Sequence, residues 1–308
     1  MLSPSDILFG VLLPFALAGL TLTLARLVAK GNSWAGPAAI GVAFVVAFGC
    51  IEGFAHIFPP ASAVPWLFHV GLLFTLVGLL DAVVRMPVWV RAIVVSLATV
   101  LGAGLLLRFN FVNHTWDALH GSAWLVGIAG VAVIWWCCFE YAAVNAGVVM
   151  PLGAMFIMGI AGLVVMLVAD QTIGQALGAL AVALGAAAAV VAWFKDKSLV
   201  RGTAAVVAGV GACSLAAAYF VSDVPIVDLA LVAIAPPLLA ASGWLPLGKG
   251  RPWLRVLIRL VIVLIPLGIA LGLAVKQFRE EAAERSSDPY SMVPQIDEKS
   301  FGSLTLAN

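Results

Sequence analysis

The stretch VVMPLGAMFIMGIAGLVVMLVA, residues 148–169, decides the fold together with the stretch that closely follows it, IGQALGALAVALGAAAAVVAWF, residues 173–194. Neither contains Asp, Glu, Lys or Arg. A helix needs roughly 20 apolar residues to cross the hydrocarbon core of a bilayer. Only helices and closed barrels satisfy their backbone groups in lipid, and barrel strands alternate in polarity. These continuous runs therefore predict two membrane-spanning helices joined by a short connection.

The same pattern extends outward along most of the chain. Of its 308 residues, 63% are apolar and 10% are charged, whereas soluble domains have about 45–50% apolar and about 25% charged residues. Lipid is therefore the expected solvent. The ten predicted spans cover residues 7–28, 36–58, 66–84, 88–107, 122–141, 148–169, 173–194, 203–221, 226–245 and 254–275.

We predict an all-α, polytopic transmembrane bundle of about ten helices with both termini outside. This orientation puts most Lys and Arg residues at the inward junctions, as the positive-inside rule requires. The net charge of +1 and the lack of a basic patch exclude a nucleic-acid partner. The expected location is a bacterial-type inner (plasma) membrane.

Two segments are expected to differ in character. Residues 1–275 form the transmembrane helical domain, and residues 276–308 form a polar C-terminal tail that is flexible or bound to a partner. The sequence Ser286-Ser287-Asp288-Pro289 is expected to end any helical continuation of the last span. The lipid bilayer is the first partner; membrane-complex partners are candidates through small-residue helix faces and this tail.

The second span carries the most informative polar pair. Glu52 and His56 are four residues apart and share one helical face with Gly49 and Gly53. Small residues at this spacing allow close helix packing, so the pair is expected to face the bundle. The pair is a candidate for proton, ion or substrate binding; the alternative is a structural hydrogen bond.

Helix breakers mark the ninth span. Pro236 and Pro237 fall in its middle and remove two backbone donors. Discontinuous helices at mid-membrane often build transport sites, so the two prolines are candidates for a substrate or ion site. A kinked but purely structural helix is the alternative.

The four histidines are predicted to lie on the outer side, where they are weak candidates for a metal or haem site. They are His56, His69, His114 and His120, with Asp117 three residues before the last. No paired ligand spacing supports such a site, so metal and cofactor content are left open. At the inner side we expect interfacial ion pairs of Glu140 with Arg85, Arg91 or Arg26.

No motif indicates an enzyme: phosphate-binding glycine loops, nucleophile elbows and paired catalytic carboxylates are not found. Three functions stay open. The first is a small-solute or ion permease, possibly proton-coupled. The second is a non-catalytic structural or assembly subunit of a larger membrane complex, supported by the pairs Gly174/Gly178 and Gly268/Gly272. The third is an outer-face metal, haem or quinone-binding membrane protein.

Overall fold

A computed structural model describes residues 7–29, 33–60, 62–84, 86–109, 116–195, 202–244 and 252–287. Over these ranges all regular structure is helical, and ten spans are long and apolar enough to cross a membrane. The predicted class and the number of spans are confirmed, and the protein is a multi-pass membrane protein. The terminal residues 1–6 and 288–308 lie outside the described ranges, so the side on which each terminus lies stays a prediction.

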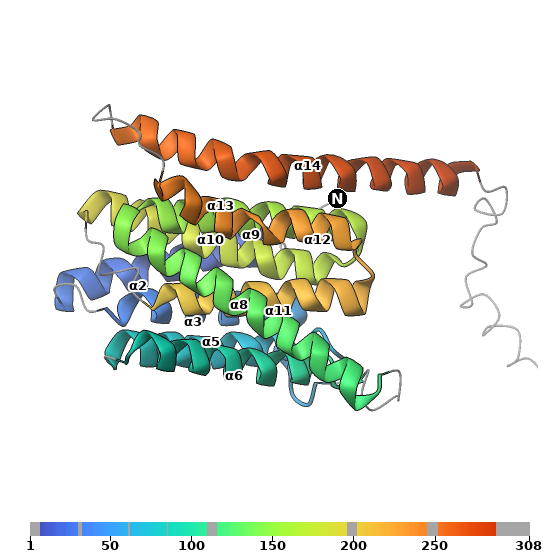
Figure 1. Ribbon diagram of the computed structural model, residues 1–308, viewed down its shortest axis with the longest axis horizontal. Coiled ribbons are helices and arrows are strands. Elements are labelled where there is room, and N and C mark those ends of the chain that lie inside the picture. Colours follow the sequence, from blue (N-terminus) through green and yellow to red (C-terminus); the bar gives the residue numbers. More distant parts are fainter. Residues whose placement is uncertain are drawn as a thin grey trace, which may run out of the picture.

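The long helices run back and forth between the two ends of the bundle in chain order (Figure 1). The first part of the chain forms η1 (Leu8–Leu12), α2 (Leu13–Ala29), α3 (Ala35–Glu52), α4 (Phe54–Ile57), α5 (Trp66–Val83) and α6 (Val88–Leu106). The second part forms α8 (Ala118–Ala146), α9 (Val149–Val168), α10 (Gln171–Phe194), α11 (Thr203–Ser222), α12 (Ile226–Ala233), α13 (Ala235–Ala241), η3 (Ser242–Trp244) and α14 (Pro252–Ser287).

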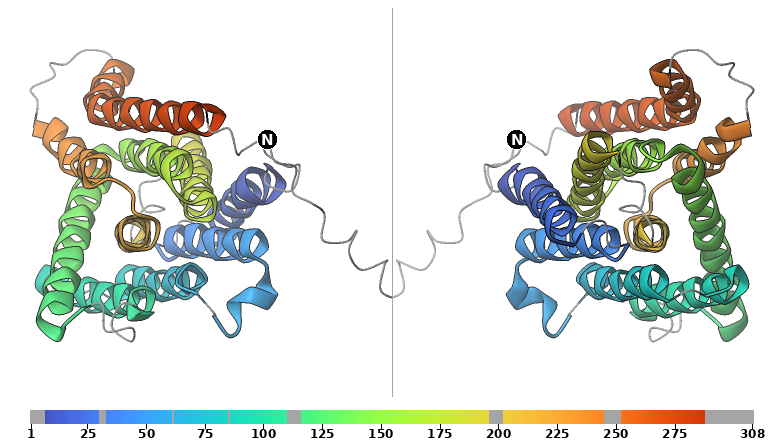
Figure 2. Two further views of the ribbon diagram at one scale, coloured as in Figure 1. Left: turned by 90° about the vertical axis from the view of Figure 1, so that its right-hand side faces the viewer. Right: turned by 90° about the vertical axis from the view of Figure 1, so that its left-hand side faces the viewer.

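Helix α11 is the centre of the bundle (Figure 2). It packs against α8, α5 and α6, and every residue from Thr203 to Ala218 is buried. Its glycines make this possible: a side chain at Gly209 would collide with the ring of Phe74, and one at Gly211 with Met158 and Trp135. Because lipid gives little hydrophobic drive for helix association, such close packing is what holds membrane helices together.

Helix α14 lies along one side of the bundle, against α9, α12 and α13 (Figure 1). Its buried stripe, Val263, Leu267, Ala270 and Ala274, has helical spacing. The helix continues without interruption to Ser287, so residues 276–287 extend the helix of the last span, which was predicted to cover residues 254–275. A 36-residue helix is about 54 Å long, well beyond the hydrocarbon core.

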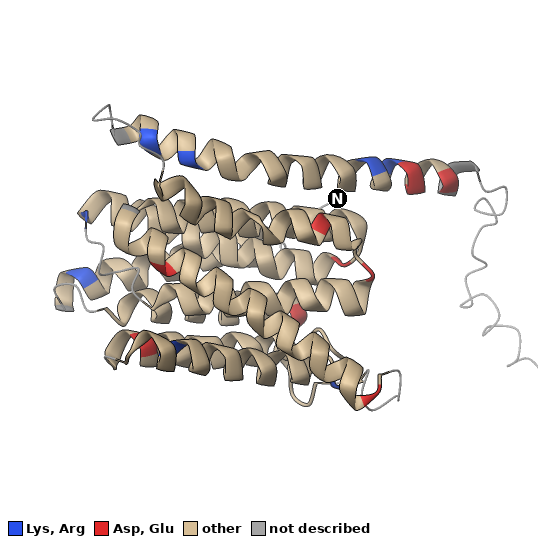
Figure 3. Cartoon of the chain, viewed as in Figure 1, with Lys and Arg blue, Asp and Glu red and all other residues tan. Residues whose placement is uncertain are grey.

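Charged residues gather toward the two ends of the bundle, whereas its middle is almost free of them (Figure 3). We name the ends by a residue at each. The Asp223 end holds the end of α3 and of α11 and the starts of α8 and α12; the Arg91 end holds the end of α5 and the start of α6.

Candidate functional site: a vestibule and groove beside the interrupted ninth span

Glu52 and His56 do not lie on one continuous helix, which corrects the predicted second span. Helix α3 ends at Glu52, and Gly53 has φ +84°, a conformation that glycine adopts more readily than other residues. His56 lies on the short helix α4, and its side chain is exposed. A side chain at Gly49 would meet the ring of Phe54, so these glycines shape the turn instead of admitting another helix.

Glu52 nevertheless has charged neighbours at the Asp223 end. Both His56 and Asp170, the N-cap of α10, are near enough to act on it electrostatically. Glu52 is half-buried. A carboxyl group near a histidine and a second carboxyl group has the composition of a proton-exchanging cluster. The role of Glu52 and His56 stays a prediction.

The histidines are engaged in separate places. His69 packs against Phe58, Trp66 and Phe68, in edge-to-face or tilted contacts with ring centroids 5.0–5.6 Å away. His120 lies on α8, where its Nε2 accepts a hydrogen bond of 3.0 Å from Trp124. His114 lies outside the described residues. Among the residues that are described, no three His, Cys, Asp or Glu side chains gather as metal ligands.

Asp117 has a local role at the start of α8. Its side chain accepts a hydrogen bond of 2.9 Å from the backbone N–H of His120 and thereby caps the helix.

The ninth span is interrupted, as the double proline predicts. Helices α12 and α13 meet at Ile234, and the prolines occupy the first turn of α13. Pro237 has no N–H to give to the carbonyl of Ala233, four residues earlier. The indole Nε1 of Trp135, from α8, donates to that carbonyl at 2.9 Å. A neighbouring helix thus satisfies a backbone acceptor that the interruption leaves open.

An aromatic vestibule opens at the Asp223 end, between the start of α8 and the connection from α11 to α12. Its volume is about 550 Å³. The vestibule is lined by Trp116, His120, Trp124, Tyr219, Phe220, Asp223, Val224, Pro225 and Ile226. The ring of Phe220 lies 4.8 Å from Trp116 and 5.0 Å from Trp124, at interplanar angles of 78° and 79°. Aromatic walls therefore meet nearly at right angles beside one carboxylate.

An apolar groove continues from the vestibule along α12. It has a volume of about 300 Å³ and shares Trp124, Tyr219, Phe220 and Ile226 with the vestibule. Its far end is lined by Ala233, the residue whose carbonyl Trp135 holds. The groove passes over Gly127 of α8, where an added side chain would meet no atom within 4 Å. A mostly apolar hollow with a few polar groups is the usual composition of a ligand site, and the vestibule and groove together have it.

Asp228 is a buried acid on α12, the helix that borders the groove, and the sequence analysis did not single it out. It lies in α12 and is only 3% exposed. Helical spacing places it away from the groove face formed by Leu229, Ala230 and Ala233. No described residue forms an ion pair with it. The sequence does show this acid within the ninth apolar run, and an acid inside an apolar span is a functional candidate by default.

An ionic clamp joins three helices at the Arg91 end. Arg91 of α6 donates to both carboxylate oxygens of Asp81 on α5, and to Oε1 of Glu140 on α8 at 2.9 Å. Its guanidinium also lies 5.0 Å from the ring centre of Trp136. The predicted pairing of Glu140 with a nearby arginine is confirmed for Arg91, and Asp81 joins it. Three helices are thereby fastened together at the end opposite the vestibule.

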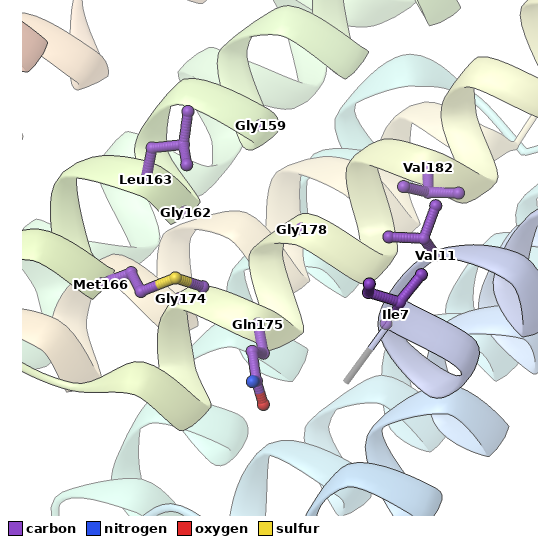
Figure 4. Close-up of a pocket in the computed structure, with 11 residues that line it drawn as sticks. Ile7, Val11, Gly159, Gly162, Leu163, Met166, Gly174, Gln175, Gly178 and Val182 are labelled. Atoms are coloured by element: carbon purple, nitrogen blue, oxygen red, sulfur yellow. The ribbon is translucent and has the colours of Figure 1, made fainter. Parts of the chain in front are cut away.

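A second cavity, of about 150 Å³, lies between the N-terminal helix, α9 and α10 (Figure 4). Of the predicted small-residue pair, Gly174 lies against α9, where an added side chain would approach the carbonyl oxygen of Gly162 at 2.7 Å. Gly178 lines the cavity, and a side chain added there would meet no described atom within 4 Å. The side-chain nitrogen of Gln175 is buried without a partner among the described residues. The cavity is separate from the vestibule and groove, which share no lining residue with it.

The predicted candidates thus fall into two separate groups. Pro236 and Pro237 interrupt a span that packs on α8, α14 and α9, while Glu52 and His56 belong to the layer of α2, α5 and α10. No protein-family model, curated protein or solved structure matches the chain.

Proposed function

We propose that the protein is a permease whose substrate enters through the vestibule and the groove. The observation that carries this proposal is the continuity of the path: a vestibule at one end leads into a groove that ends where the ninth span is interrupted. Discontinuous helices often build transport sites. Alternating access requires one part of the bundle to move against another, and a short helix such as α12 can be part of such a movement.

The clamp and the vestibule fit complementary roles in such a cycle. The vestibule is open at the Asp223 end, while Arg91 joins α5, α6 and α8 at the other end. In the proposed cycle this arrangement is the state that receives substrate. Release toward the Arg91 end requires the clamp to separate and α12 to shift.

Asp228 is the proposed coupling group. It is buried on α12, the short helix that borders the groove. A buried carboxyl group without a cation partner is costly when charged, so its proton exchange would bias the position of α12. Glu52 and His56 stay candidates for a separate proton relay, and Glu52→Gln tests that role through the pH dependence of uptake.

The experiment is uptake into proteoliposomes from a panel of organic cations, zwitterions, anions and neutral solutes, each in short-chain and long-chain form. Wild type is expected to take up at least one member above protein-free liposomes. Gly127→Leu fills the groove and is expected to abolish that uptake. Gly130→Leu is the matched control, because it lies on the same helix, is equally open and borders a different hollow.

A structural or assembly role is the second candidate, favoured by α14. This helix reaches beyond the membrane-spanning length, and a side chain added at its Gly268 or Gly272 would meet no atom of the described residues within 4 Å. Co-purification of a stable complex that is lost on truncation after Lys276 would favour this role. A solitary, monodisperse protein that takes up a panel member would exclude it as the main function.

A further inference from the structure

We propose that the vestibule and groove together bind an amphiphile with a quaternary ammonium head group, its head in the vestibule and its chain in the groove. This inference rests on the proposed function, since it names the substrate class of the same site. It is carried by the chemistry of the lining residues.

The vestibule has the composition of a site for an alkylated cation. Trp116, Trp124 and Phe220 supply aromatic faces, and Asp223 supplies the carboxylate. Aromatic faces attract cations, and cages of such rings are how proteins recognise quaternary ammonium groups. None of the residues that line the vestibule is Lys or Arg, so no positive charge of the lining opposes the ligand.

The vestibule suits a methylated ammonium better than a primary one. A primary ammonium has three N–H donors that need acceptors. The Nε2 of His120, one of the few acceptors in the lining, already receives a hydrogen bond from Trp124. A quaternary head has no donors to satisfy, so aromatic contact and one carboxylate are sufficient for it.

The groove favours a ligand that carries an alkyl chain on its cationic head over a small free cation. Apart from the indole and phenol groups of Trp124 and Tyr219 at its mouth, every lining side chain is aliphatic, aromatic or absent. From Ile226 to Ala233 the groove runs about 10 Å along α12. An alkyl chain attached to the bound head would therefore continue directly along the groove, in van der Waals contact with its apolar side chains.

The test is binding of radiolabelled decyltrimethylammonium to the full chain in nanodiscs of phosphatidylglycerol and phosphatidylethanolamine, which contain no quaternary ammonium lipid. Wild type is expected to bind in excess of empty nanodiscs. Asp223→Asn is expected to weaken binding about fivefold through loss of the charge. Asparagine also tolerates the positive φ of +54° at this position, so the fold is preserved. Gly127→Leu should weaken binding about tenfold through loss of the space for the chain, and Gly130→Leu should bind as wild type does.

Competition separates head from chain. Unlabelled decyltrimethylammonium should displace the probe at far lower concentration than tetramethylammonium or decyl sulfate. Equal displacement by tetramethylammonium would overturn the assignment of the groove, and equal displacement by decyl sulfate would overturn that of the vestibule. Binding without uptake of any panel member contradicts the permease alone, whereas uptake of other solutes without binding of this probe contradicts the substrate class alone.

Discussion

The indole N–H of Trp135 donates at 2.9 Å to the carbonyl of Ala233, the acceptor that Pro237 leaves open in the ninth span. The adjacent Trp136 is equally buried, but its indole nitrogen has no acceptor among the described residues. The two tryptophans therefore form a comparison: Trp135 has the hydrogen bond to Ala233, and Trp136 has instead the contact with the guanidinium of Arg91, which a phenylalanine ring can keep.

Trp135→Phe is expected to destabilise the protein by about 1 kcal/mol more than Trp136→Phe does. Both changes remove the same atoms, but only the first leaves a buried carbonyl without a partner. Unfolding in detergent, followed by circular dichroism, measures the difference. Equal losses of stability would mean that the hydrogen bond contributes nothing to holding the interruption.

The clamp at the Arg91 end gives a prediction about charge. Arg91→Met leaves Asp81 and Glu140 without their cation, and Asp81 is only 4% exposed. Removing one partner of a buried ion pair costs about 3 kcal/mol or more. The triple variant Asp81→Asn, Arg91→Met, Glu140→Gln has no uncompensated charge and should recover most of that loss. If the triple variant unfolds as readily as Arg91→Met, uncompensated charge is not the cause.

The contact between α9 and α10 depends on one glycine of a spaced pair. An added side chain at Gly174 would lie 2.7 Å from the carbonyl oxygen of Gly162, whereas Gly178 is open. Gly174→Ala should therefore destabilise the protein by about 2 kcal/mol through overpacking, and Gly178→Ala should be neutral or slightly stabilising. Thermal unfolding of the two variants tests this, and a larger loss for Gly178→Ala would contradict the packing described.

The sequence predicts the number of spans well because apolar length is a strong signal in lipid. The interruption near Pro236 was also predictable, since proline removes a donor wherever it stands in a helix. The end of α3 was not: Gly53 fits both a small-residue packing face and a helix stop, and only its contacts with α4 distinguish the two.

The vestibule could not be predicted from the chain because its parts are far apart in sequence. Trp116 and Trp124 near the start of α8 meet Tyr219 and Phe220 at the end of α11 only through tertiary packing. Individually these rings resemble ordinary aromatic residues at a membrane interface. Asp228, in contrast, was visible in the sequence as an acid within an apolar run.

The most direct test of the permease is the accessibility of position 233 from the two sides of the membrane. Ala233→Cys, placed at the far end of the groove in a background whose four native cysteines are replaced by alanine, is labelled by a membrane-impermeant maleimide in oriented liposomes. With the clamp intact, labelling is expected from the Asp223 side; with the neutral triple clamp variant, it is expected from the Arg91 side as well. Labelling confined to one side in both proteins, or absent from both sides, would contradict alternating access through this groove.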